Sequence, residues 1–134
     1  MATVREINEN DDARFGLKFP LEYHVDKGGF FPTSKTLKEQ ASSNLKNLLL
    51  TVKGERVGQP DFGCEITSIL FEQITDGNTD FLKEDISAKI EEFFPNIILT
   101  SLNVSQNVDF NSLIVDINYQ VANTNINDNI TLNL

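Results

Sequence analysis

The spacing of the apolar residues changes at Pro95, and this change restricts the folds open to the chain. Before Pro95 the apolar side chains recur every three or four positions, as on one side of an α-helix. Such helices are expected over 34–51, 64–72 and 79–93. After Pro95 apolar and polar residues alternate, which is typical of half-buried strands. These strands are expected over 97–108, 112–122 and 125–134.

This order of elements predicts an α+β fold in which three helices precede a three-stranded antiparallel meander. Residues 1–32 show neither spacing, and they hold Pro20, Pro32 and several aromatic side chains. We expect an extended N-terminal arm that lays its rings on its own domain or on a neighbour, because rings exposed to water favour aggregation. The remaining residues, 33–134, are predicted to form a single domain.

Polar residues and glycine indicate where the first helix begins and ends. Thr36 and Glu39 have the spacing of a capping box, although Thr33 or Ser34 could equally begin the helix. Gly54 is suited to close its C-terminus, because glycine readily adopts the left-handed conformation. We therefore expect this helix to end near Gly54.

One segment has part of the pattern of a calcium-binding loop. Asp76, Asn78 and Asp80 occupy the first, third and fifth positions of that pattern. The sixth position requires glycine and the twelfth glutamate, and the chain has phenylalanine and serine there. We therefore expect a turn over 75–78, after which Thr79 caps the third helix.

The formal net charge is −9, and the acidic residues are concentrated after the first helix. From residue 57 onward the chain has twelve aspartates and glutamates but only two lysines, Lys83 and Lys89. Such a surface repels phosphate groups, so we predict no nucleic-acid or membrane partner and favour a basic protein. No apolar run approaches the ~18 residues of a membrane span, and the first ten residues lack the apolar core of a signal peptide. We expect a reducing, soluble compartment.

Few residues are available for catalysis or for a cofactor. Cys64 is the only cysteine, which excludes an internal disulfide and a zinc site built from several thiolates, and its apolar neighbours indicate a buried position. His24 is the only histidine and lies in the arm. The glycines Gly54, Gly58 and Gly63 do not have the spacing of a phosphate-binding loop. We predict no cofactor and no metal.

Three carboxylates leave one catalytic alternative open. A glycosidase uses two carboxylates that flank the bond it cleaves, and Glu55, Asp61 and Glu65 are close in sequence. In the structural alternative, Glu55 pairs with Lys53 or Arg56, and Asp61 caps the short second helix. We prefer the structural alternative and predict that the chain is not an enzyme.

The string LLLTVKGERVGQPDFGCEITSILFE, residues 48–72, carries a more specific pattern. An apolar helix is followed by Gly-x-Arg, by Pro-x-Phe-Gly-Cys and, after a few residues, by Leu-Phe-Glu. These positions are Gly54, Arg56, Pro60, Phe62, Gly63, Cys64, Leu70, Phe71 and Glu72. The pattern and its gaps resemble the family of small baseplate wedge proteins of contractile tails, described as sheath initiators and sometimes as lysozyme-like. The resemblance extends from about Ser42 to the C-terminus.

The resemblance implies a structural protein of the virion, located in the tail baseplate and assembled in the host cytoplasm. Its partners would be other wedge proteins and the tail sheath protein, with the tail tube as a further candidate. An equivalent subunit of a bacterial injection or secretion machine would have the same architecture. The family usually shows Glu-Pro-Arg after the last helix, whereas this chain has Phe94-Pro95-Asn96. Both charges are absent, so a neighbour would be held there by apolar contact.

Wedge contacts are expected at Gly54, Arg56, Pro60, Phe62, Gly63, Phe94 and Pro95. For Phe62 two interpretations remain: an exposed anchor for a partner, or a side chain of the core. The last strand is expected to bind the sheath, because the free main-chain groups of an edge strand can pair with an incoming strand. In the alternative, the N-terminal arm covers this strand. Its expected contact residues are Ile126, Asp128, Ile130, Leu132 and Leu134.

Overall fold

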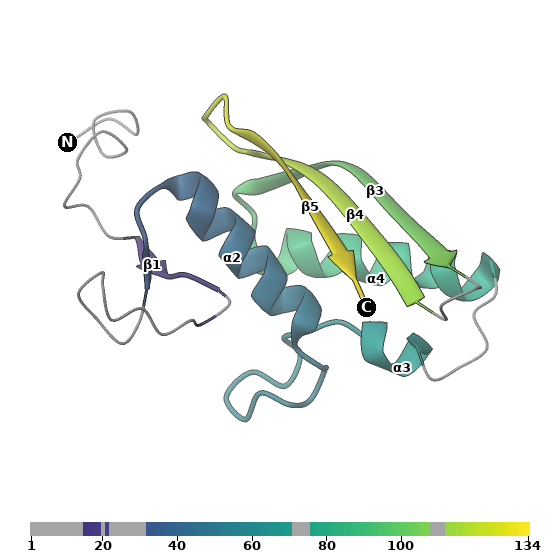
Figure 1. Ribbon diagram of the computed structural model, residues 1–134. Helices are drawn as coiled ribbons and strands as arrows, with labels where there is room; N and C mark the ends of the chain where they lie inside the picture. The colour runs from purple at the N-terminus through teal and green to yellow at the C-terminus, as the bar shows by residue number, and fades with distance from the viewer. Residues whose placement is uncertain (1–14, 20, 22–31, 71–75, 108–111) are drawn as a thin grey trace. The chain divides into compact units, whose positions relative to one another are not determined.

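The computed structural model describes residues 15–19, 21, 32–70, 76–107 and 112–134 (Figure 1). Most of the predicted arm, including His24, lies outside these residues, as do Phe71 and Glu72 of the family pattern. The contacts between α-carbons divide the chain into two units, Met1–Asn47 and Leu48–Leu134. Each unit is described by itself.

In the first unit, two short strands join the described part of the arm to the segment before the first helix. Strand β1 (Gly16–Leu17) pairs antiparallel with β2 (Thr33–Ser34). The amide of Phe15 donates to the carbonyl of Ser34 at 3.0 Å, and the amide of Lys18 donates to that of Pro32 at 2.8 Å. The arm is therefore held by main-chain hydrogen bonds over 15–18.

Helix α2 (Leu37–Leu50) starts in the first unit and ends in the second. The Thr36 hydroxyl accepts a hydrogen bond from the amide of Glu39 at 3.2 Å, so Thr36 is the N-cap among the alternatives. The Glu39 carboxylate accepts from the amide of Lys35 at 3.0 Å, which completes a variant of the capping box. The predicted range 34–51 gives the C-terminal end to within one residue, but Gly54 does not close the helix as expected. The helix stops at Leu50, because the next residues pair with the chain around Cys64.

The second unit has two further helices, α3 (Ile66–Leu70) and α4 (Asp76–Phe93). The predicted turn over 75–78 is wrong for its described residues, and Thr79 lies inside α4 instead of capping it. Small polar residues favour turns, but they are also tolerated in a first helical turn, where the amides have no carbonyl partner within the helix. No described helix has the length and apolar content needed to cross a membrane.

The sheet of the second unit has the order β3-β4-β5, and both neighbouring pairs are antiparallel. Its strands are β3 (Ile97–Asn107), β4 (Ser112–Val121) and β5 (Asn127–Asn133). In this register Leu102, Ile117 and Ile130 line up across the three strands. A bulge lies between Leu99 and Ser101. The α+β class with an antiparallel sheet is confirmed.

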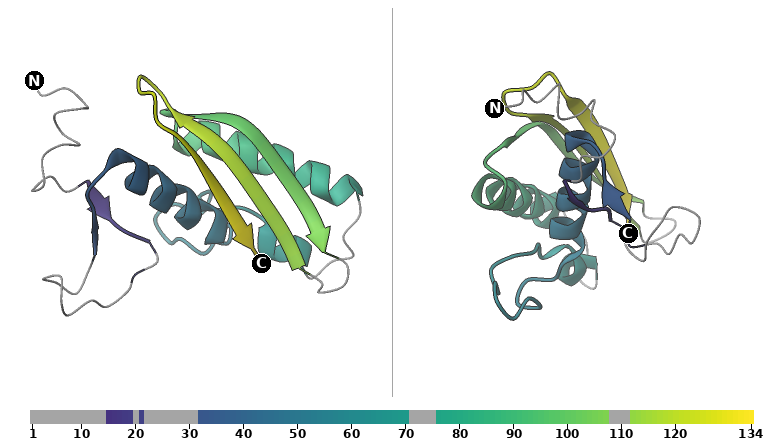
Figure 2. Two further views of the ribbon diagram at one scale, coloured as in Figure 1. Left: turned by 45° about the horizontal axis from the view of Figure 1, so that its top comes forward. Right: turned by 90° about the vertical axis from the view of Figure 1, so that its left-hand side faces the viewer.

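Helix α4 runs along one face of this sheet and contacts β3 (Figure 2). Every second side chain of β4 from Leu113 to Tyr119 is buried on the inner face, and one apolar stripe of α4 is buried as well. The fully buried members are Leu82, Ile86, Ile90, Leu113, Val115, Ile117 and Tyr119. Burial of each aliphatic side chain contributes roughly 1.5–3 kcal/mol, so this layer supplies much of the stability of the unit.

Candidate functional site

The segment between α2 and α3 forms a loop whose two ends are joined. The amide of Cys64 donates to the carbonyl of Thr51 at 3.0 Å, and Val52 forms a parallel bridge with Cys64. Gly63 is required at this crossing, because its φ is +119° and a Cβ would lie 2.5 Å from the Thr51 carbonyl oxygen. The predicted corner between helices is thus a closed loop.

Hydrogen bonds inside the loop hold its shape. The amide of Gly54 donates to the carbonyl of Pro60 at 2.8 Å, across the loop. The amide of Gln59 donates to the carbonyl of Arg56 at 3.1 Å, which closes the turn at the tip. At the base, the Glu55 carboxylate accepts from the amide of Val52 at 3.2 Å. Because these bonds are internal, the loop does not need a partner to order it.

Phe62 is buried, with only 5 % of its surface exposed, which decides between its two interpretations. Its ring packs edge-on against Phe93 at 5.1 Å and Phe94 at 6.5 Å between ring centroids. The Arg56 guanidinium lies over the same ring, 4.4 Å from its centroid. The structure therefore brings together three of the residues expected to contact the wedge: Arg56, Phe62 and Phe94.

Val57 is the most exposed apolar residue that the structure describes in the loop, and sequence reasoning missed it. Its side chain is fully exposed at the tip, next to Arg56. Gly54 and Pro60 of the expected contacts are also exposed, whereas Gly63 is buried. The signal in the sequence was an isolated valine within a glycine-rich polar stretch, which is weak because single exposed apolar residues are common.

The end of α4 leads directly into the sheet beside this loop. The amide of Ile97 donates to the carbonyl of Phe94 at 2.9 Å, and the amide of Ala122 donates to that of Asn96 at 2.8 Å. Pro95 and Asn96 are exposed and Phe94 is half-buried. Phe94 and Pro95 thus lie beside the stack of Arg56 on Phe62. The name loop surface is used here for these four residues together with Val57.

The three acidic residues of the loop lie in different surroundings. Glu55 binds its own main chain, and Glu65 lies 3.5 Å from Lys53 as an ion pair. Asp61 is exposed and does not cap α3. The amide of Glu65 before that helix instead donates to the carboxylate of Asp85 at 3.4 Å. Glu55 does not form the expected ion pair, because Lys53 pairs with Glu65 and Arg56 lies over the Phe62 ring.

Cys64 is buried, as expected, with 1 % of its surface exposed. Burial raises the pKa of its thiol to about 12, and the nearby Asp85 adds to the increase while Lys89 opposes it. A thiol with this pKa is protonated at neutral pH and is a poor nucleophile. Among the described residues, no three side chains of His, Cys, Asp or Glu group together to hold a metal ion.

A second surface lies along β5. The amides of Leu113 and Leu134 each donate to the carbonyl of the other, at 2.8 and 2.9 Å, and the amide of Val121 donates to that of Ile126. Antiparallel pairs alternate between bonded and non-bonded positions, so the even-numbered residues of β5 direct their main chain toward β4. The odd-numbered ones direct theirs away: Asn127, Asn129, Thr131 and Asn133. No described strand pairs with this side of β5.

For the residues expected to bind the sheath, the side chains and the main-chain groups therefore have to be considered separately. Ile130 is buried, and Ile126, Asp128, Leu132 and Leu134 are half-buried. Their side chains share the face of the core, and their main chain faces β4 and bonds it, except that the Ile126 amide donates to the Thr124 hydroxyl. The free main-chain groups belong to their four neighbours, which the sequence could not distinguish without the strand order.

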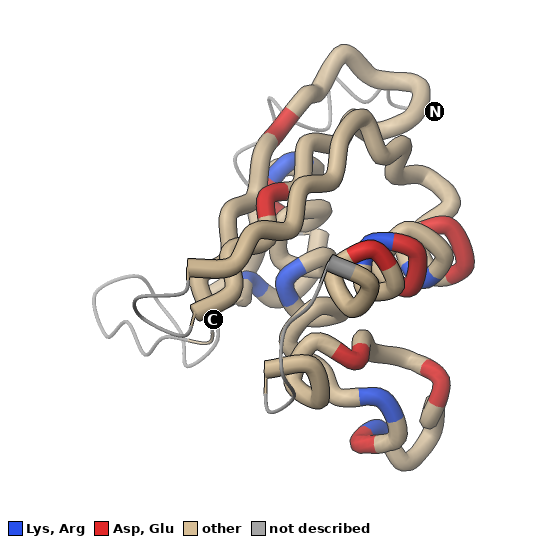
Figure 3. The backbone as a smooth tube through the Cα atoms, turned by 90° about the vertical axis from the view of Figure 1, so that its right-hand side faces the viewer, with Lys and Arg blue, Asp and Glu red and all other residues tan. Residues whose placement is uncertain are grey.

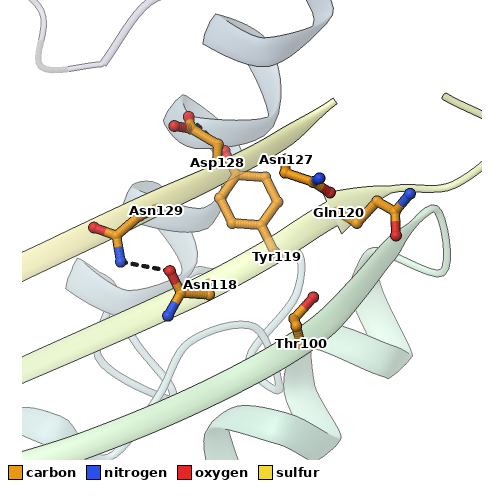
Figure 4. A pocket seen from close by; sticks show the side chains of 7 residues that line it. All are labelled: Thr100, Asn118, Tyr119, Gln120, Asn127, Asp128 and Asn129. Atoms are coloured by element: carbon orange, nitrogen blue, oxygen red, sulfur yellow. Dashed lines mark hydrogen bonds between the residues drawn. The ribbon is translucent and has the colours of Figure 1, made fainter. Parts of the chain in front are cut away.

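The outer face of the sheet carries a row of uncharged polar side chains (Figure 4). The Asn118 amide group donates to the Ser101 hydroxyl at 2.7 Å, and that of Asn129 donates to the Asn118 carbonyl oxygen at 2.8 Å. The Thr131 hydroxyl donates to Asp116 at 2.6 Å. A shallow depression of about 630 Å³ lies at one end of the sheet, lined by Thr100, Asn118, Gln120, Asn127 and Asn129 together with Tyr119 and Asp128 of the inner face. These side chains mostly bond one another across the strands.

The comparison with known families includes the loop surface and ends just before β5. Residues 35–126 match the family described as "Baseplate wedge protein gp25". The chain belongs to this family. It is 32 % identical over 79 residues to the baseplate wedge protein gp25 of Enterobacteria phage T4. That alignment covers 59 % of this chain and 60 % of the relative, so the chain spans about three fifths of the length of the curated relative it matches.

Solved structures share the fold. A protein of Geobacter sulfurreducens, provisionally named a tail lysozyme, matches with a TM-score of 0.64 and 28 % identity, over 72 % of this chain and 88 % of that one. A chain of the anti-feeding prophage baseplate matches with a TM-score of 0.66 and 24 % identity, over 81 % and 86 %. A chain of the type VI secretion baseplate complex matches with a TM-score of 0.61 and 15 % identity, over 71 % of this chain and 89 % of that one. The last two establish the fold alone.

Proposed function

We propose that the chain is a non-enzymatic wedge subunit of a contractile phage tail that starts assembly of the tail sheath. Family membership places it among baseplate wedge proteins of contractile tails. The observation that carries the sheath role is the free side of β5, where four residues offer amides and carbonyls that pair with no described strand. The subunit would be built into the baseplate in the host cytoplasm and remain in the virion.

The loop surface is the proposed contact with other wedge subunits. Its shape is set by internal hydrogen bonds, so a partner loses little free energy in ordering it. Val57 would enter an apolar pocket of the neighbour, and Arg56, held over Phe62, offers its donors beside it. Phe94 replaces a charge that the family usually carries, which favours apolar contact over an ion pair at this point.

The free side of β5 is the proposed contact with the sheath protein. An incoming strand would pair with the main chain of Asn127, Asn129, Thr131 and Asn133. On the inner face its side chains would continue the apolar layer of Ile130 and Leu132, and on the outer face they would meet amides and hydroxyls. A sheath strand with alternating apolar and polar residues therefore fits this edge. Within β5 neither proline nor a basic residue opposes such pairing.

Reconstitution tests both contacts. The intact chain, a chain cut after Thr124 and the Val57→Asp variant are each mixed with the baseplate subassembly and sheath protein, and electron microscopy counts incorporated subunits and sheath tubes. We expect Val57→Asp to lose incorporation and the cut chain to incorporate but start no tubes. Tubes that grow equally from the cut chain would remove β5 from the proposal, provided circular dichroism shows that the cut chain folds.

A peptidoglycan glycosidase is the second candidate, favoured only by the lysozyme name given to the Geobacter relative. Its carboxylates would be Glu55, Asp61 and Glu65. Two of these bind the main chain or a lysine, and the third lies exposed at the loop. Purified protein is expected to release no sugar from cell walls. Release that the three alanine variants abolish would establish the enzyme instead.

A further inference from the structure

The outer side of α4 carries a row of exposed residues outside both surfaces proposed above. These residues lie opposite the buried stripe of Leu82, Ile86 and Ile90. The exposed side chains that the structure describes on α4 are Gly77, Asp80, Phe81, Glu84, Ala88, Glu91 and Glu92. This set is called the outer face of α4. It has four carboxylates, one aromatic ring and no basic residue, and acidic positions crowd along the helix in Figure 3.

Two of the four carboxylates are neutralised within the helix. Asp80 lies 3.2 Å from the amino group of Lys83, and Glu92 lies 3.0 Å from that of Lys89. The hydrogen bond to Glu92 raises the pKa of Lys89, which keeps that lysine charged. Glu84 and Glu91 have no hydrogen bond or ion pair with any described residue. They lie seven residues apart, about 10.5 Å along the helix axis.

Four residues of this face, two apolar and two acidic, follow the spacing of a helix–helix contact. Phe81, Glu84, Ala88 and Glu91 are separated by three, four and three residues, which is the seam spacing of paired helices. The Phe81 ring is 56 % exposed, although burial of such a ring stabilises a complex. The small Ala88 lies between the two glutamates and allows the backbone of another helix to approach closely.

We infer that a basic α-helix of another baseplate subunit packs along the outer face of α4. This inference rests on the proposed wedge function. Covering Glu84 and Glu91 with an apolar helix would bury two unpaired charges, so the partner must carry Lys or Arg at a matching spacing of seven residues. A second copy of this chain is disfavoured as the partner, because the glutamates on its outer face of α4 would lie against those of the first copy. An apolar residue of the partner, one turn beyond the cation opposite Glu84, would cover Phe81.

Site-specific cross-linking in assembled baseplates tests the inference. The photoreactive residue benzoylphenylalanine replaces Phe81 in the full chain, the baseplates are irradiated, and mass spectrometry identifies the joined peptide. A matched chain carries the same residue at Thr67, which is exposed on α3. We expect Phe81 to join a helical segment of another subunit with basic residues seven positions apart, and Thr67 not to join that segment.

Charge variants supply the second readout. Glu84→Gln/Glu91→Gln is expected to weaken binding of that subunit at least tenfold, and its salt dependence should fall. Thr67→Lys/Asn103→Lys changes the net charge equally at exposed positions elsewhere and should leave binding within twofold. Charge reversal of both glutamates to lysine, combined with glutamates on the partner, should restore binding.

Cross-links only to residues 1–47, to a second copy or to nothing, in baseplates that contain the chain, would overturn the inference. Equal binding by the two double variants would overturn it as well. If the unlabelled chain itself fails to enter baseplates, the wedge function fails, so the two failures can be told apart.

Discussion

The loop between α2 and α3 and the edge strand β5 offer opposite kinds of surface. In the loop, the main-chain groups bond one another, and what remains for a partner is a set of side chains around Arg56 and Val57. In β5 the side chains are engaged with the core or with one another, and what remains is main chain. Substitutions in the loop should therefore act through the identity of the side chain, and substitutions in β5 through the loss of an amide hydrogen.

The largest expected effect separates the buried and exposed parts of the loop surface. Phe62→Ala removes a buried ring packed against Phe93, and we expect a loss of ~3–5 kcal/mol in the free energy of unfolding. Val57→Ala should change it by less than ~0.5 kcal/mol, because Val57 is fully exposed. Urea denaturation measures both. Similar losses for the two variants would show that the loop is not divided in this way.

The next effect concerns the crossing that closes the loop. Gly63→Ala places a Cβ against the Thr51 carbonyl at a positive φ, and we expect a loss of ~2–3 kcal/mol. Gly58→Ala is the matched control, since a Cβ there meets nothing within 4 Å and should cost under ~1 kcal/mol. Thermal unfolding followed by circular dichroism compares them. A tolerated Gly63→Ala would mean that the closure is looser than described.

Much of the fold could be predicted from the apolar spacing, because the change at Pro95 separates helices from strands. The buried stripe of α4 and the inner face of β4 follow directly from it. The predicted helix boundaries were less accurate where tertiary contacts determine them. Helix α2 ends before Gly54 because Val52 pairs with Cys64, and α4 begins before Thr79.

The site was predicted less completely. Phe62 could not be assigned from sequence, because exposed anchors and core rings have the same local pattern. Val57 was missed, since exposure depends on how the loop closes. The free amides of β5 required the strand order and the register, which depend on pairings between distant residues.

A smaller effect tests the burial of Cys64. The folded-state pKa of its thiol is about 12 against an ordinary value of 9.0, so the unfolded chain loses this proton first as the pH rises. The contribution of the buried, protonated thiol to the free energy of unfolding is present below pH 9.0 and is lost between pH 9.0 and about 12. Stability relative to Cys64→Ala should fall there by up to ~1.4 kcal/mol per pH unit. Parallel stability curves for the two proteins would contradict the burial.

The central claim, that β5 starts the sheath through its main chain, is tested most directly at Asn129. Asn129→Pro removes an amide that faces away from β4, and Asn129→Ala removes the same side-chain bond to Asn118 but keeps the amide. Both variants should fold and enter baseplates. Counting sheath tubes per baseplate by electron microscopy, we expect tubes from Asn129→Ala at near the original number and a loss of at least tenfold from Asn129→Pro. Equal numbers from the two folded variants would contradict initiation by strand pairing at β5.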